Sequence, residues 1–222
     1  MKHLLKSITA IALLTVAVAS CQKERITRTD DNSSAQSIFT KKSSGADCCT
    51  SGTTEYTTEW VDSTAAVRGT WPPLNFDFCS GSFVSSSSSY HFSLTNRFNS
   101  YVTGNTGWTL SYLDGTSYPV SNYNSISCIS TGSLNPSTNN TMGMGQLNGG
   151  SLLTPPGWYN YNFATHGIDP IRLMVVSNGT KYYLLYIESI TPDNVRTNPL
   201  PPFNKQMRAT IKFHYKCIEV CS

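Results

Sequence analysis

Six cysteines between residues 48 and 221 are the most reactive side chains of the sequence: Cys48, Cys49, Cys79, Cys128, Cys217 and Cys221. An even number of cysteines is typical of disulfide-bonded exported domains. Free buried thiols and zinc ligands are the alternatives. Neither the vicinal pair at 48 and 49 nor the C-x3-C spacing at 217 and 221 has the usual spacing of zinc ligands, so disulfides are the favoured interpretation.

The pairing of these cysteines can be predicted only in outline, because six thiols can pair in fifteen ways. Vicinal cysteines seldom bridge each other, so Cys48 and Cys49 are each expected to reach elsewhere. We predict one bridge between Cys79 and Cys128. A second would tie Cys48 or Cys49 to Cys217 or Cys221 and so join the two ends of the domain.

Histidine and methionine side chains are the other candidate ligands. His166 lies in a Thr-His-Gly turn that follows an aromatic run. Met142 and Met144 lie in the Gly- and Asn-rich stretch 135–150, which is expected to be a long loop. The thioether of methionine is adaptable and can ligate haem iron. An ordinary turn histidine and a mobile loop with incidental methionines are the competing interpretations.

Motifs of known catalytic machinery are absent from the sequence. There is no G-x-S-x-G elbow, P-loop, H-E-x-x-H helix or EF-hand loop. His91 lies in a predicted strand, and His214 is expected on the polar face of the last strand. The chain is therefore not expected to be an enzyme.

The first 20 residues are typical of an export signal. Lys2 and Lys6 precede an apolar stretch of about a dozen residues, which is shorter than the about 20 residues of a membrane span. Val18-Ala19-Ser20-Cys21 then resembles the lipobox of bacterial lipoproteins. Cleavage before Cys21 would leave it as an acylated N-terminus that anchors the chain in a membrane. An ordinary signal peptide with a chance cysteine is the alternative.

Composition supports an exported domain behind a tether. Residues 21–46 are polar and too poor in apolar side chains to fold alone, so they are expected to be flexible, and the charged residues 22–25 point to the cell surface. Residues 47–222 form the predicted domain. Without Lys2 and Lys6, the 16 Lys and Arg become 14 against 13 Asp and Glu. This balance gives no basic face for nucleic acid.

Period-two patterns predict an all-β fold, an antiparallel sandwich or rolled sheet. Residues 208–218 alternate between apolar and polar side chains, as in a half-buried strand. Asn178-Gly179 separates two β-branched and aromatic runs and predicts a hairpin that pairs Ser177 with Thr180. Further strands are expected at 55–62, 74–79, 89–95 and 108–113, and no segment has the pattern of an amphipathic helix.

The order of these motifs resembles the HmuY-like haem-binding lipoproteins. The resemblance rests on GWYNYN at 157–162, Thr165-His166, the Asn178-Gly179 hairpin and ATIKFHY at 209–215. Upstream, NFDF at 75–78 and YHFSL at 90–94 resemble the early strands of that family, with Tyr90 and His91 in place of its Trp-Asp. The likeness covers residues 76–218 and is strongest after residue 157.

This resemblance implies an all-β surface lipoprotein of the outer membrane that captures haem and passes it to a receptor. The family holds iron with histidines or methionines. At the place of one family histidine this sequence has Phe163, and the other ligand region aligns loosely with 135–150. The implied axial ligands are Met142 or Met144 with His166, and the implied cations near the haem propionates are Arg172 and Lys181.

Two further functions remain open from the sequence. One is a non-haem surface binding or adhesion module on the same scaffold, whose aromatic side chains contact a sugar, a peptide or a protein. The other, an exported hydrolase, has little support because no catalytic motif is present.

Replacing Cys21 with serine tests the lipid anchor. We expect Cys21→Ser to abolish lipid labelling and release the protein from the membrane fraction, because residues 22–46 contain no other apolar segment able to hold it. Cell fractionation with a radiolabelled fatty acid measures both effects. Retention of the variant in membranes would exclude a lipid anchor at Cys21.

Overall fold

The computed structural model describes residues 48–62, 71–200 and 204–221. The expected leader, Cys21 and the expected tether lie outside these residues. The described chain is mostly β, in mainly antiparallel sheets, with three short 3-10 turns: η1 (Arg97–Asn99), η2 (Val120–Ser125) and η3 (Thr131–Ser133). None of the described helices is long and apolar enough to cross a membrane.

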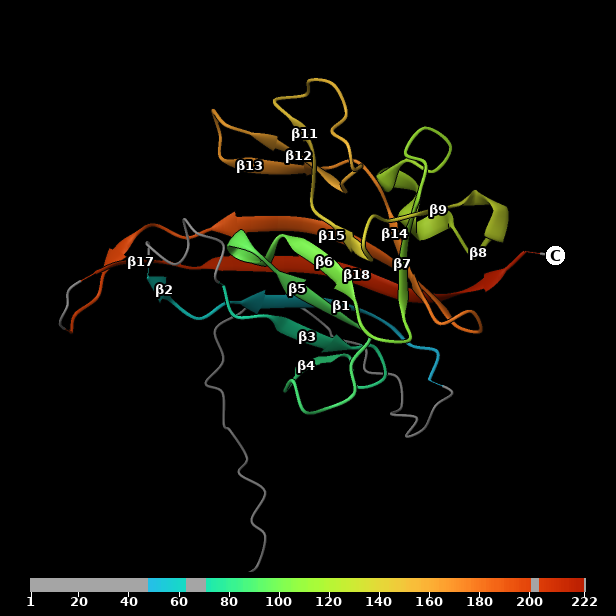
Figure 1. Cartoon of the computed structure of the whole chain (residues 1–222), viewed down its shortest axis with the longest axis horizontal. Helices are drawn as coiled ribbons and strands as arrows, with labels where there is room; N and C mark the ends of the chain where they lie inside the picture. Colours follow the sequence, from blue (N-terminus) through green and yellow to red (C-terminus); the bar gives the residue numbers. More distant parts are fainter. Residues whose placement is uncertain (1–47, 63–70, 201–203, 222) are drawn as a thin grey trace, which may run out of the picture. The chain divides into compact units, whose positions relative to one another are not determined.

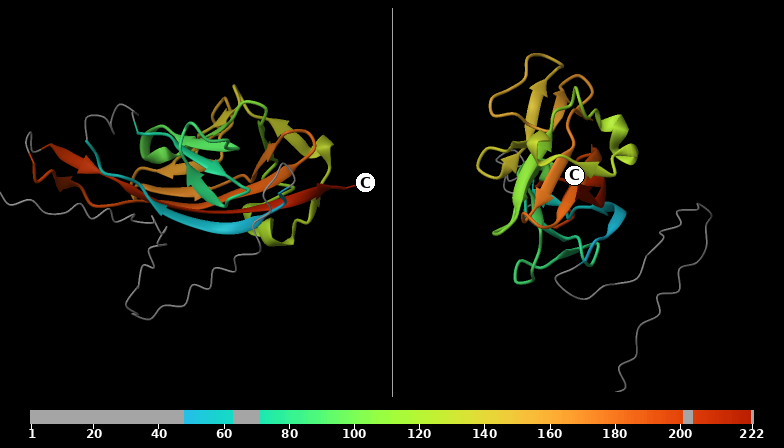
Figure 2. Two further views of the ribbon diagram at one scale, coloured as in Figure 1. Left: turned by 90° about the horizontal axis from the view of Figure 1, so that it is seen from below. Right: turned by 90° about the vertical axis from the view of Figure 1, so that its right-hand side faces the viewer.

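A seven-stranded sheet is the largest sheet of the described residues (Figure 1). Its order is β1 (Ser51–Thr57), β18 (Ala209–Val220), β15 (Tyr182–Pro192), β14 (Met174–Ser177), β7 (Thr109–Leu113) and β9 (Leu134–Pro136), and the short β8 (Cys128–Ile129) pairs with the end of β18. The long strands β15 and β18 pair at ten positions. Figures 1 and 2 show these two strands side by side.

Three smaller sheets complete the structure. The five-stranded sheet contains β10 (Thr141–Met142), β6 (Tyr101–Gly104), β5 (Phe92–Thr95), β3 (Leu74–Asp77) and β4 (Ser82–Val84), in that order. The first three-stranded sheet contains β11 (Met144–Leu147), β12 (Tyr159–Asn162) and β13 (Gly167–Pro170). The second contains β16 (Arg196–Thr197), β17 (Lys205–Met207) and β2 (Val61–Asp62).

The main core fills the space between the seven- and five-stranded sheets. Phe76 packs edge-on against Phe213 with ring centroids 4.9 Å apart, and Phe78 stacks on Tyr183 at 4.1 Å. The alternation predicted for 208–218 is confirmed through residue 216, because odd-numbered residues such as Ile211 and Phe213 are buried while their neighbours are more exposed. It is wrong at the end of this stretch, where Cys217 is partly buried and Ile218 is buried. Burial of these apolar and aromatic faces is the main stabilising contribution to such a fold.

The predicted hairpin is confirmed, although its register differs by two residues. Ser177 pairs with Tyr182 instead of Thr180. The side-chain oxygen of Asn178 accepts hydrogen bonds from the backbone N–H groups of Thr180 and Lys181. These bonds stabilise a loop of four residues, 178–181, between the two strands. A shift of two residues keeps every side chain on its predicted face.

The stretch 135–150 is not the long loop that its composition predicts. It contains the end of β9, then β10 and β11. Asn139 and Asn140 adopt left-handed backbone angles and form the tight turn, as asparagine does readily. The amide of Asn140 also donates to the carbonyls of Gly104 and Trp108, at 2.9 and 2.8 Å.

Three disulfides join all six cysteines, Cys48 to Cys79, Cys49 to Cys217 and Cys128 to Cys221. The predicted link between one of the vicinal cysteines and the end of the domain is confirmed by Cys49 and Cys217. The predicted bridge from Cys79 to Cys128 is wrong. Parallel pairing of β8 with β18 places Cys128 opposite Glu219 and so beside Cys221, a long-range contact that spacing does not reveal.

Removing the longest disulfide loop tests this connectivity. The Cys49 and Cys217 pair is separated by 168 residues. The chain-entropy model gives this bridge a stabilising contribution of about 5 kcal/mol, and loss of a native bridge typically costs about 2–5 kcal/mol. We expect a double Cys49→Ala, Cys217→Ala variant to lose about that much free energy of unfolding in urea. Peptide mapping without reduction provides the control, and recovery of a peptide linking Cys79 to Cys128 would contradict the observed pairing.

Candidate functional site

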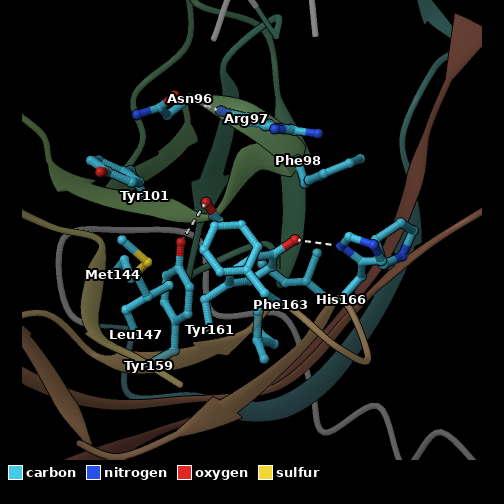
Figure 3. Close-up of a pocket in the computed structure, with 14 residues that line it drawn as sticks. Asn96, Arg97, Phe98, Tyr101, Met144, Leu147, Tyr159, Tyr161, Phe163 and His166 are labelled. Atoms are coloured by element: carbon cyan, nitrogen blue, oxygen red, sulfur yellow. Dashed lines mark hydrogen bonds between the residues drawn. The ribbon is translucent and has the colours of Figure 1, made fainter. Parts of the chain in front are cut away.

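A pocket of about 320 Å3 lies between η1, the β11–β12–β13 sheet and the end of β15 (Figure 3). Its size falls at the lower end of the range for small-molecule sites. Its aromatic lining consists of Phe98, Tyr101, Tyr159, Tyr161 and Phe163. The remaining apolar lining is Met144, Leu147, Ile168, Ile190 and Pro192, and the polar lining is Asn96, Arg97, Ser100 and His166.

The loop between β5 and β6 forms one wall under backbone strain. Asn96, Phe98 and Asn99 have φ values of 64°, 55° and 52°. A bulky residue such as phenylalanine rarely adopts this left-handed region, and such outliers cluster at functional sites. Buried Asn99 holds the loop by donating to the carbonyls of Pro72 and Leu94, at 2.8 and 3.0 Å.

The facing wall is fixed to this loop by two hydrogen bonds. The indole N–H of Trp158 donates to the carbonyl of Ser100 at 2.9 Å, and the hydroxyl of Tyr159 donates to the Ser100 hydroxyl at 3.2 Å. Backbone also approaches closely behind this wall, where a Cβ on Gly157 would collide with the carbonyl of Gly143. This wall, which is called the floor of the pocket below, is therefore rigid, and its close backbone packing requires glycine at position 157.

A tyrosine and a histidine are paired at the more exposed side. The hydroxyl of Tyr161 and Nδ1 of His166 are 2.9 Å apart (Figure 3). Tyr161 lies on β12, and exposed His166 lies in the turn to β13 with a φ of 53°. Asn162 Oδ1 shapes that turn by accepting from the N–H groups of Ala164 and Thr165.

The charges of the pocket favour an anionic ligand. Arg97 is exposed and lies at the pocket, with its guanidinium carbon 5.1 Å from the centroid of the Phe98 ring. Among the described residues that line the pocket, none is a carboxylate. The site therefore combines flat aromatic walls with one permanent positive charge.

The sequence-predicted ligands separate into two groups. Met144 and His166 both line the pocket. Met142 is 1% exposed and belongs to the core between the sheets, so its thioether does not face the pocket. Phe163 also lines the pocket and is 57% exposed.

The two cations predicted near the propionates lie elsewhere. Arg172 is buried, donates to the carbonyl of Gly157 at 2.6 Å and stacks on the Tyr112 ring. Lys181 lies in the turn between β14 and β15 and is not a lining residue. Arg97, which the sequence did not single out, is the cation that lines the pocket among the described residues. Nothing in its sequence context, Asn-Arg-Phe-Asn, pointed to it except the asparagines that adopt left-handed angles.

Searches of protein-family models, curated proteins and solved structures found no match to this chain. No family is therefore assigned. The chemistry of the pocket is the basis on which a function can be proposed.

A second cluster of potential metal ligands contains Cys48, Cys79 and His91. The two thiols are joined in a disulfide, and so are not free to bind a metal in this state. Burial lowers the pKa of His91, while Asp77, whose Oδ1 is 3.0 Å from His91 Nδ1, acts in the opposite direction. This arrangement serves to join the start of β1 to the end of β3.

A chain of hydrogen bonds on the seven-stranded sheet links Thr53, His214 and Glu188. The Thr53 hydroxyl lies 2.8 Å from His214 Nδ1, and His214 Nε2 lies 2.6 Å from Glu188. Lys212 binds the same carboxylate at 2.9 Å, and the hydrogen bonds from His214 and Lys212 lower the pKa of Glu188. These residues do not line the pocket described above. The order of groups resembles that of a catalytic triad.

Because the phenol of Tyr159 is buried, the free energy of unfolding is expected to fall at alkaline pH. Burial raises the pKa of Tyr159 to about 12, against an ordinary value of about 10 in the unfolded chain. The contribution of the neutral phenol is therefore complete below about pH 10 and is lost as the pH rises towards about 12. We expect Tyr159→Phe to flatten this decline in urea unfolding of the oxidised protein. Parallel declines in the parent and the variant would contradict it.

Proposed function

We propose that this protein is an extracytoplasmic binding protein, not an enzyme, whose pocket carries a flat, largely apolar ligand with an acidic group. The observation that supports this most directly is the combination of aromatic walls with Arg97 as the one guanidinium and no carboxylate among the described lining residues. Haem has this character, because it is a flat apolar ring with two carboxylates. Haem is therefore the proposed ligand, as the resemblance to HmuY-like lipoproteins also implies.

The wider context belongs to the same proposal. The described residues form a mostly β domain of one seven-stranded, one five-stranded and two three-stranded sheets, and an HmuY-like type of fold is part of the proposal. The three disulfides fit an oxidising compartment outside the cytoplasm. With acylation at Cys21, the protein would be held on the outer membrane at the cell surface, where it would pass haem to a receptor.

A non-haem surface module is the second candidate, favoured by exposed apolar side chains in the connections of the β11–β12–β13 sheet. Phe163 is 57% exposed, and Leu152 and Leu153, in the crossover between β11 and β12, are 53% and 39% exposed. Exposed aromatic and aliphatic groups of this kind are typical of protein or peptide contacts. In this alternative the pocket would take a side chain of a partner.

Haem titration into the purified oxidised protein distinguishes the two candidates. We expect a saturable change in visible absorbance. Arg97→Gln should weaken binding by about two- to fivefold, because an exposed ion pair contributes roughly 0.2–1 kcal/mol. Arg196→Gln is the matched control, since Arg196 stacks on Trp60 and does not line the pocket. If neither ferric nor ferrous haem gives a saturable change, the haem proposal fails and the surface module becomes the better candidate.

A further inference from the structure

Tyr161 and His166 form the one phenol and imidazole pair that the structure shows within the described lining of the pocket. Backbone pairing fixes the phenol in place, because Tyr161 pairs with Leu147 on one side and Ile168 on the other. The imidazole is fixed by a turn of only four residues between β12 and β13. Tyr161 is half-buried, with its ring packed against the main core, and His166 is exposed.

A phenolate is an established protein ligand for haem iron, and it requires that the phenolic proton be taken up elsewhere. His166 meets this requirement. When the proton of the neutral ring is on Nε2, Nδ1 is the acceptor for the Tyr161 hydroxyl. Figure 3 shows the hydroxyl of Tyr161 directed at the ring of His166.

The other tyrosines of the pocket do not have this arrangement. The hydroxyl of Tyr159 donates to Ser100 Oγ, which is a hydroxyl and not a base at neutral pH. Tyr101 packs with its ring against Gly143, where an added Cβ would collide with the ring carbons. Tyr161 is therefore the phenol whose surroundings suit it to bind a metal.

We propose that Tyr161 is the iron ligand for ferric haem in this pocket and that His166 is its positioning residue; this inference rests on the proposed function. An iron–oxygen bond forms at Tyr161 Oη as the O–H bond breaks, and the proton moves to Nδ1 of His166. The resulting imidazolium donates back to the phenolate oxygen, and exposed His166 can pass a proton to water. No electron is transferred, and iron remains ferric.

Tyr161 and Met144, as iron ligands, would favour opposite oxidation states of haem iron. The phenolate is a hard, anionic oxygen donor and stabilises ferric iron, whereas the soft thioether of Met144 would favour ferrous iron. Reduction should therefore weaken haem binding if Tyr161 is the ligand. It should strengthen binding if Met144 is the ligand.

The experiment compares ferric haem binding by the parent, Tyr161→Phe and His166→Ala, with Tyr182→Phe and His214→Ala as matched controls. Tyr182 donates to the carbonyl of Gly179 in the hairpin, and neither Tyr182 nor His214 lines the pocket. The parent should show a phenolate-to-iron charge-transfer band, with phenolate ring vibrations in resonance Raman spectra, that Tyr161→Phe lacks. Loss of His166 should weaken ferric haem binding by about 10- to 100-fold, as loss of a group that orients a metal ligand does. His166→Ala should weaken that band even at saturating haem, and His214→Ala should leave it unchanged.

Iron-free protoporphyrin tests whether the pocket remains intact. Both pocket variants should bind it as the parent does, because the ring makes no bond to Tyr161 without iron. Loss of porphyrin binding by Tyr161→Phe would mean that the hydroxyl shapes the pocket and would overturn the ligand assignment. Equal ferric haem affinity and spectra in the parent and Tyr161→Phe would also overturn it, while leaving haem as the cargo. Failure of the parent to bind haem would overturn the proposed function together with this inference.

Discussion

The packing of β18 against the five-stranded sheet is the constraint on which the rest of this domain depends. Its period-two alternation directs Phe213 and Tyr215 into one layer, where Phe213 meets Phe76 edge-on at 4.9 Å. β18 also pairs with β1, β15 and β8, so one strand determines the position of three others. Two of the three disulfides then join residues in or just after β18 to distant segments. A defect in this strand would therefore affect the sheet, the core and the covalent links together.

Features of the fold that depend on local pattern could be predicted from the sequence, and those that depend on distant contacts could not. Alternation in β18 through residue 216 and the Asn178-Gly179 turn are read within about a dozen residues, and both predictions were confirmed. The register of the hairpin was wrong by two because Asn178 bonds to two backbone N–H groups beyond the expected turn. The cysteine pairing was only partly right, since the parallel contact of β8 with β18 has no local signal.

The candidate site was harder to predict because its residues come from four separate segments. His166 and Met144, predicted from residue type alone, line the pocket, but residue type also selected Met142, whose side chain β10 directs into the core. From the sequence, Arg172 is an equally reasonable cation for the site. In the structure, its hydrogen bond to the carbonyl of Gly157 holds it inside the domain. Arg97 and Phe98 are on the pocket because a run of left-handed residues reverses the chain after β5. Asparagine on both sides of this pair is the local signal that could have revealed them.

The pocket joins a rigid floor to a more exposed lip, and this division would suit the proposed function, in which a ligand is both held and released. The floor is tied by Trp158 and Tyr159 to Ser100, which are all buried and shielded from competition by water. The lip consists of the β12–β13 turn with Phe163 and His166, whose hydrogen bonds are exposed to solvent. Segments with few buried contacts and exposed hydrogen bonds open at low free energy. Opening the lip would separate His166 from Tyr161 without disturbing the aromatic core, so the element that holds the ligand and the element that stabilises the fold are distinct.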